Sequence, residues 1–331
     1  MTVPVVAFFN NKGGVGKTTL VYHVAWMLNE LGRAVAVLDL DPQANLTASF
    51  VDDRRIEQLW SGSSRRTVYG ALAPLFEGEG GIADPHVEEV APDLCLVPGD
   101  LLLSGAEQDL SFTWAGSLGG DVRAFRVTTA FSTVAQRAAA LTEAEIVLID
   151  VGPNLGAINR AAMVACDHVV VPLAPDLYSL QGLQNLGPTL RTWRRDWADR
   201  AGRAPRPDLH VPGGQMFPRG YVVLQHGTRV DRVVGAYDRW LRQMPAEYRR
   251  SVLDEPADRV PLAAEDEHCL GLLKHYHSLA PLAQEARKPI FLLRSADGAI
   301  GAHQRAVREA YGHFESLTRR LLSVIDLEVA A

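Results

Sequence analysis

Asn10-Asn11-Lys12-Gly13-Gly14-Val15-Gly16-Lys17-Thr18-Thr19 is the stretch that decides the fold of this 331-residue chain. It follows an apolar, β-branched segment, Val3 to Phe9, and it leads into a helical pattern from Thr18 to Leu31 that ends at Gly32. A glycine-rich turn between a buried strand and a helix start directs consecutive N–H groups at an anion. The stretch therefore predicts a phosphate-binding loop.

The residue types in this loop suit a nucleoside triphosphate. Lys17 would place a positive charge on the β- and γ-phosphates, and the Thr18 hydroxyl is a ligand for the Mg²⁺ that bridges phosphate oxygens. A dinucleotide site is excluded, because the third glycine of that fingerprint is missing and Thr19 stands in its place. We expect the nucleotide to be bound by Lys12, Gly13, Gly14, Val15, Gly16, Lys17, Thr18 and Thr19.

Other apolar runs have the same strand character and alternate with helical patterns. They are Ala34–Leu40, Ile146–Ile149, His168–Pro172 and Tyr221–Leu224. This rhythm predicts an α/β fold with a doubly wound, mostly parallel sheet flanked by helices, in a single domain over residues 1–331. Residues 200–285 fit the rhythm least, and we expect there a helical insertion packed on the edge of the sheet.

Carboxylates follow two of these strands. Asp39-Leu40-Asp41-Pro42 ends the second strand, and Ile146–Ile149 is followed by Asp150 and a Gly-Pro turn. Ligands of open parallel sheets bind at the carboxyl ends of the strands. We therefore expect Asp150 to hold Mg²⁺ through a water molecule. Taken alone, the Asp-Pro pair is equally well explained as a turn that ends a strand.

Lys12, which follows Asn11 where a standard P-loop has glycine, gives the loop a second lysine. This loop resembles the deviant Walker A loop of the ParA/MinD family of ATPases. The resemblance implies that Lys12 reaches across a dimer interface to the partner's nucleotide; the alternative is a lysine solvated beside the loop. Val170–Leu186 resembles the strand and helix that form part of the family's dimer face, which would place Asp176 and Gln181 near the partner.

Two further stretches resemble the switch elements of the same family. Asp39 to Asn45 resembles the first switch, which implies that Asp41 acts in hydrolysis and that Asp39 assists near Mg²⁺. Gly152-Pro153 resembles the second switch, although family members often have Pro-Pro there. This departure leaves the role of Asn154 open.

The resemblance continues more weakly in the last third of the chain. Gly220–Gln225 resembles the strand that leads to the adenine pocket, and Lys288–Ile290 resembles the strand before the closing helices. We therefore expect adenine contacts near Gln225 and Pro289.

The family resemblance implies a Mg²⁺-dependent ATP hydrolase that forms a homodimer on binding ATP and hydrolyses it slowly, as a switch. Its expected setting is DNA partitioning or the positioning of an intracellular cargo, with a ParB-like or other stimulating protein partner. The alternative is an ATP-dependent regulatory switch that acts on a protein partner without binding DNA. A metabolic enzyme with a related P-loop would need a second substrate pocket, for which the sequence has no motif.

Charge is unevenly distributed along the chain. The formal charge is −6 overall, whereas residues 191–250 contain thirteen arginines against six acidic residues and carry +7. Such a window is typical of non-specific DNA binding. It is equally typical of a solvated helix face on which arginines pair with acidic neighbours, and the sequence leaves both interpretations open.

Cysteine content and hydropathy indicate the compartment. Three widely separated cysteines predict no disulfide framework, and no apolar run approaches the ~18 residues that span a bilayer. The segment Phe314–Ile325 has only Arg319 and Arg320 as basic residues, so we expect a closing helix and not a lipid-binding one. We expect a cytoplasmic protein without membrane contact, associated with the nucleoid if the arginine window binds DNA.

Overall fold

The structure is a computed structural model that describes residues 2–62, 65–226, 233–276 and 278–327, with side chains except at 225–226 and 233–237. Within these ranges, eight strands form one sheet in the order β3-β4-β2-β5-β1-β6-β7-β8. β3 is antiparallel to β4, and the other neighbouring strands are parallel. The strands are β1 (Val5–Phe8), β2 (Val35–Asp39), β3 (Glu88–Ala91), β4 (Leu94–Val97), β5 (Ile146–Asp150), β6 (His168–Leu173), β7 (Phe217–His226) and β8 (Cys269–Lys274).

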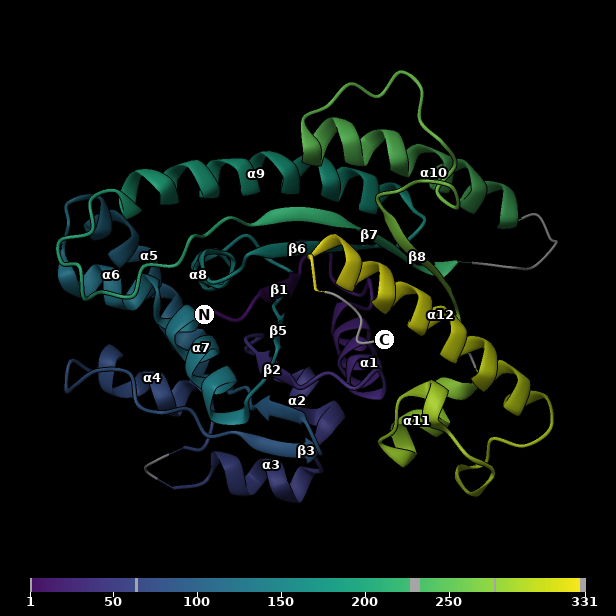
Figure 1. The fold of residues 1–331 in the computed structure, drawn as a ribbon, viewed down its shortest axis with the longest axis horizontal. Coiled ribbons are helices and arrows are strands. Elements are labelled where there is room, and N and C mark those ends of the chain that lie inside the picture. Colours follow the sequence, from purple (N-terminus) through teal and green to yellow (C-terminus); the bar gives the residue numbers. More distant parts are fainter. Residues whose placement is uncertain (1, 63–64, 227–232, 277, 328–331) are drawn as a thin grey trace.

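Helices cover both faces of the sheet (Figure 1). One face packs against α4 (Val68–Phe76), α5 (Ala106–Leu118), α6 (Val122–Thr128), α7 (Ala130–Thr142), α8 (Ala157–Val164), α9 (Leu177–Ala201) and α10 (Val233–Glu247). The other face packs against α1 (Lys17–Glu30), α2 (Asn45–Phe50), α11 (Leu279–Ala286) and α12 (Ala302–Val324). The short helix α3 (Asp53–Trp60) begins at its N-cap Asp52, whose side chain accepts a hydrogen bond from the Arg55 N–H.

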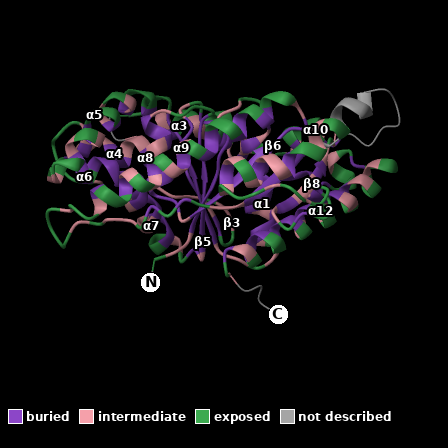
Figure 2. Ribbon diagram, turned by 90° about the horizontal axis from the view of Figure 1, so that it is seen from above, coloured by how far each residue is buried: buried purple, intermediate pink, exposed green. Residues whose placement is uncertain are grey.

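The central strands are buried on both faces, which is why they read as unbroken apolar runs. Every residue of β1, β2, β5 and β6 is buried. Figure 2 shows the buried residues gathered along the middle of the molecule, with exposed residues on the outer sides of the helices. The predicted doubly wound, mostly parallel sheet is confirmed, including the strands expected between residues 34 and 173.

The last third of the chain differs from the expected pattern in two places. Residues 200–285 contribute β8, which was not expected, to the sheet beside β7, which contains the expected strand Tyr221–Leu224. The helical part of this region is α10, the π-helical turn Tyr248–Leu253 and most of α11. Lys288–Ile290 does not form a strand. Pro289 instead caps a short 3-10 helix, Ile290–Leu292, because the Ile290 N–H is bonded to a histidine side chain and not to a neighbouring strand.

Helix α9 and the turn Tyr248–Leu253 approach each other with their backbones in contact. Gly187 is buried in α9, and a Cβ added there would lie far closer to the Ser251 carbonyl oxygen than non-bonded atoms can approach. Glycine is therefore required for this packing. The contact anchors the region after β7 onto the sheet's helical layer.

Replacing Gly187 with alanine should destabilise the fold by about 2–3 kcal/mol, because the added methyl group forces two backbones apart. The matched control is Gly312→Ala in the exposed part of α12, where a Cβ would meet no atom within 4 Å. That change should be neutral or stabilise by up to about 1 kcal/mol. Chemical denaturation of both variants measures the difference. Equal stability of the two would show that the α9 contact tolerates separation.

Helix α12 lies on the protein with its apolar side inward. Phe314, Leu317, Leu321 and Leu322 are buried in the core it shares with α1 and β8. This confirms the expected closing helix. Over the residues with described structure, no helix has both the length and the apolar character needed to cross a membrane.

Candidate nucleotide site

The sheet register brings the sequence-predicted carboxylates together. β1 lies between β5 and β6, and Phe8 at its end is paired with Asp150. Asp150 is in turn paired with Asp39 on β2. The loop after β1 and the two carboxylates therefore share the carboxyl edge of the sheet, the position at which open parallel sheets bind ligands.

The loop Lys12–Gly16 has the conformation needed to surround an anion. Gly14 and Gly16 have φ angles of 72° and 86°, a region that glycine occupies without strain. Val15 is buried and anchors the loop. Among the described residues no side chain caps the start of α1, which leaves the N–H groups of its first turn available for phosphate oxygens.

Asn10 shapes the entrance of this loop. Its side chain is 1% exposed, donates to the Pro172 carbonyl oxygen over 2.6 Å and accepts from the Lys12 N–H over 2.9 Å. These two bonds tie the loop to the end of β6. Sequence reasoning assigned no role to Asn10, because its partner Pro172 is remote in the sequence.

Lys17 points inward at the base of the loop. Its side chain is buried, and Nζ donates to the Lys12 carbonyl oxygen over 3.2 Å. Burial lowers the pKa of Lys17, while the negative charges of Asp150 and Asp41 act in the opposite direction. A cation in this position can compensate the charge of bound phosphates.

Asp150 is a buried carboxylate without a partner of its own. Neither of its oxygens has a hydrogen-bond partner among the described residues, and the Thr18 hydroxyl lies near without completing a regular bond. Burial, and next the charge of Asp39, raise the pKa of Asp150 well above its usual value. Oxygen ligands of this kind are those that Mg²⁺ prefers, so Asp150 and Thr18 fit the ion that such a loop requires.

Asp39 lies beside Asp150 but is already engaged. Its Oδ2 accepts from the Thr47 N–H over 2.8 Å and from the Thr47 hydroxyl over 2.7 Å. Burial raises the pKa of Asp39, partly offset by these bonds. Asp39 therefore orders the start of α2 in addition to lying near the expected ion.

Asp41 faces the second switch. It is 7% exposed and accepts from the Gln43 N–H over 3.0 Å. A Cβ on Gly152 would come within 3.3 Å of Asp41 Oδ1, so the two candidate switch segments touch. Pro153 lies against Gly13 of the phosphate loop in the same way, 3.9 Å from the position of a Cβ there.

Two residues outside the predicted motifs hold the second switch in place. Buried Asn159 donates from Nδ2 to the carbonyl oxygens of Gly152 and Asn154, over 2.7 and 2.6 Å. The Glu107 carboxylate of α5 accepts from the Ala157 N–H over 2.5 Å and from the next N–H over 2.9 Å, at the start of α8. The switch loop is thus coupled to α5.

Lys12 points away from its own loop. Its ammonium pairs with Asp176, the N-cap of α9, and lies 5.8 Å from the centre of the exposed Tyr178 ring. The structure therefore brings Asp176 to the phosphate loop, and Gln181 lies exposed along α9, donating to Gln184. That both residues lie near a partner subunit stays a prediction.

The expected adenine side is partly described. Leu224 at the end of β7 lies against Gly16, 3.1 Å from the position of a Cβ on that glycine. The side chain of Gln225 lies outside the described residues. Pro289 precedes Ile290, whose N–H is bonded to His23 of α1, so this segment is packed against the helix that follows the phosphate loop.

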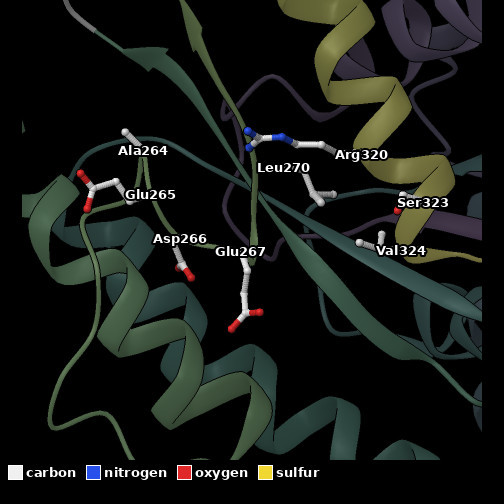
Figure 3. A pocket seen from close by; sticks show the side chains of 8 residues that line it. All are labelled: Ala264, Glu265, Asp266, Glu267, Leu270, Arg320, Ser323 and Val324. Carbon is white, nitrogen blue, oxygen red and sulfur yellow. The ribbon is translucent and has the colours of Figure 1, made fainter.

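A separate cavity lies away from this site, beside the amino-terminal end of β8. It has a volume of about 350 Å³, is open to solvent, and is lined by the loop Ala264–Glu267, Leu270 and the end of α12 (Figure 3). Arg320 on its wall donates to the Cys269 carbonyl oxygen, and Asp266 is paired with Arg249. None of the predicted nucleotide-site residues lines it.

The fold and the phosphate loop define a P-loop protein. Residues 3–200 match the family described as AAA domain, and this chain belongs to that family and to the ParA/MinD group of P-loop ATPases. It is 32% identical over 190 residues to the chromosome partitioning protein ParA of Caulobacter vibrioides, covering 57% of this chain and 63% of ParA. It thus spans less than two thirds of that relative.

Another relative covers more of the chain. A protein of Pseudomonas putida described as uncharacterized is 32% identical over 291 residues, which are 86% of this chain and 96% of that protein. Among solved structures, a protein of Corynebacterium diphtheriae has a TM-score of 0.71 at 24% identity, covering 97% of this chain and 98% of that one. A putative plasmid partition protein of Borrelia burgdorferi bound to AMPPNP has a TM-score of 0.59 at 15% identity, covering 98% and 99%. These two structural likenesses establish the fold alone.

Proposed function

We propose that this chain is a ParA-like ATPase that dimerises on binding ATP and hydrolyses it slowly, as a switch that partitions DNA or positions an intracellular cargo. The observation that carries the proposal is that the chain has a complete phosphate loop and, within it, a second lysine, Lys12, whose side chain is directed away from the loop. Membership of the ParA/MinD family supports it.

The chemistry follows from the positions of the side chains. The N–H groups of the loop and Lys17 would hold the phosphates, with Thr18 and Asp150 as the ligands for Mg²⁺ and Asp39 beside them. Mg²⁺ would supply charge compensation on the phosphate oxygens. Asp41, in contact with Gly152, would orient the attacking water near the γ-phosphate.

Exposed apolar side chains support dimerisation through the carboxyl edge of the sheet. Leu101, Leu155, Leu177 and Tyr178 follow the carboxyl ends of β4, β5 and β6 and have exposed fractions of 38–73%. Apolar side chains gathered around a binding site are typical of a surface that another protein covers. Lys12 beside Tyr178 would cross to the nucleotide of the second subunit.

Many arginines of residues 191–250 already make contacts within the protein, so fewer are available to bind DNA than the composition suggests. Arg191, Arg194 and Arg200 donate to backbone carbonyl oxygens, and Arg249 pairs with buried Asp266. The exposed arginines of the window that have an acidic partner within reach are Arg195, Arg206, Arg242 and Arg250. Arg229 and Arg232 lie outside the described residues, and Arg203 and Arg239 are exposed. These pairings favour the alternative function, a switch acting on a protein partner without DNA.

Binding to random-sequence duplex DNA separates the two functions. The DNA-partitioning function predicts binding with ATP and not with ADP or without nucleotide, and this binding should weaken with salt, because phosphate contacts release counterions. The protein-partner switch predicts no DNA binding with any nucleotide. Replacing Arg195, Arg242 and Arg250 together with glutamine should reduce the log–log salt slope by about 3. Equilibrium titrations at several salt concentrations measure both effects.

The charge-matched control replaces Arg305, Arg308 and Arg319 of α12, which are exposed on another part of the molecule. That variant should bind DNA like the wild type. If no nucleotide state binds DNA while ATP still drives dimerisation, the protein-partner switch is the better function. If ATP drives neither DNA binding nor dimerisation, the proposed ATP-dependent dimer is wrong.

A further inference from the structure

His23 connects the first turn of α1 to the segment that precedes α12. Its side chain is buried, with Nδ1 2.7 Å from the Thr19 carbonyl oxygen, and its Nε2 accepts from the Ile290 N–H over 3.1 Å. A carbonyl oxygen only accepts and a backbone N–H only donates, so the imidazole is neutral with its proton on Nδ1. Burial lowers the pKa of His23 to about 4, in agreement with this form.

The ring is also fixed from its sides. Phe314 of α12 stacks on it with ring centres 4.8 Å apart and an interplanar angle of 17°, and Phe291 meets it edge-on at 5.8 Å. An imidazole held by two hydrogen bonds and two aromatic rings has one orientation. The distance between Thr19 and Ile290 is therefore set by one rigid side chain.

The bridge from Thr19 through His23 to Ile290 lies on the side of the phosphate loop toward which the nucleoside of a bound nucleotide would extend. Asp39, Asp41 and Asp150 occupy the side toward β5 and β2. On the opposite side, Leu224 of β7 touches Gly16 and the segment 289–290 packs beside the first turns of α1. With the phosphates in the loop and the carboxylates on the first side, the base would extend toward this second side.

We propose that His23 is a positioning residue that sets the Pro289–Ile290 segment against the phosphate loop and thereby determines the preference for an adenine base. This inference rests on the proposed ATP-binding function. Discrimination between purines depends on polar backbone groups at a fixed position, and a shifted segment no longer matches them. The phosphates are held by the loop itself, so their affinity does not depend on His23.

The test compares ATP, GTP and inorganic tripolyphosphate, each with Mg²⁺, by isothermal titration calorimetry on the full chain. His23→Phe keeps an aromatic ring beside Phe314 but removes both hydrogen bonds. Ile290→Pro removes the N–H donor of the bridge and also the isoleucine side chain. Position 290 is the first of a short helix, where proline is tolerated. Ile290→Ala is its matched control, because it loses the side chain and keeps the N–H.

We expect His23→Phe and Ile290→Pro to bind ATP about five- to tenfold more weakly, to lose most of the preference for ATP over GTP, and to bind tripolyphosphate like the wild type. Ile290→Ala should keep the preference. Unchanged ATP/GTP ratios in both bridge variants would overturn the inference and leave the proposed function standing. A wild-type protein that binds neither ATP nor tripolyphosphate would overturn the proposed function, and this inference with it.

Discussion

Replacing Lys17 with alanine is expected to abolish ATP binding at practical concentrations. Lys17 is buried at the base of the loop and is the cation placed to meet the phosphates. Removing one partner of a buried charge pair costs about 2–5 kcal/mol, which corresponds to a roughly 30-fold to several-thousand-fold loss of affinity. Equilibrium binding of a fluorescent ATP analogue measures the loss.

Lys274→Ala is the control for this experiment, because Lys274 lies at the end of β8 and pairs with Glu309 of α12. It removes the same side chain away from the loop and should leave affinity unchanged. Thermal denaturation without nucleotide verifies that both variants are folded. A Lys17→Ala protein that binds ATP like the wild type would show that the phosphates are held elsewhere.

Replacing Asp41 with alanine should leave ATP binding intact and trap the protein as ATP-bound dimers. Loss of a group that orients or deprotonates the attacking water typically lowers a hydrolysis rate by about 10²- to 10⁴-fold. The phosphate loop and Lys17 are not altered by this change. Phosphate release, together with dimer lifetime by size-exclusion chromatography in ATP, measures both effects.

Two further variants define the role of Asp41. Asp41→Asn keeps the size of the side chain and an acceptor for the Gln43 N–H, but not the charge, so it should be as defective as the alanine variant. Asp52→Ala removes an exposed helix cap at the start of α3 and should hydrolyse ATP normally. Normal hydrolysis by Asp41→Ala would exclude the proposed role.

The centre of the fold was predictable because its strands are buried on both faces. β1, β2, β5 and β6 are uninterrupted apolar runs, and a glycine loop after β1 has few alternative structures. β3 was not predicted, since Glu88–Ala91 is short, half-exposed and charged. β8 was missed for a related reason, because Cys269–Lys274 contains a glycine and lies in a region without a clear strand–helix rhythm.

Only those site residues that belong to local sequence motifs could be predicted from the sequence. Asp39 and Asp150 were found because each closes an apolar strand, and the register then places them opposite each other. Glu107 contacts a helix start fifty residues later, and His23 bonds a residue 267 positions away. No local pattern encodes such pairings. A remote contact also explains why Lys288–Ile290 is not the strand that the family resemblance implied, because the His23 side chain of α1 bonds the Ile290 N–H in place of a neighbouring strand.

The two edges of the sheet carry a consequence for solubility. An open sheet ends in strands whose free backbone groups can recruit other chains into aggregates. Here β3 exposes Glu89 and pairs Glu88 with Arg55, while the β8 carbonyl at Cys269 is bonded by Arg320 and the strand ends in Lys274. Charge at both borders disfavours growth of the sheet from molecule to molecule. Crowded copies of the chain are thereby directed away from edge-to-edge aggregation.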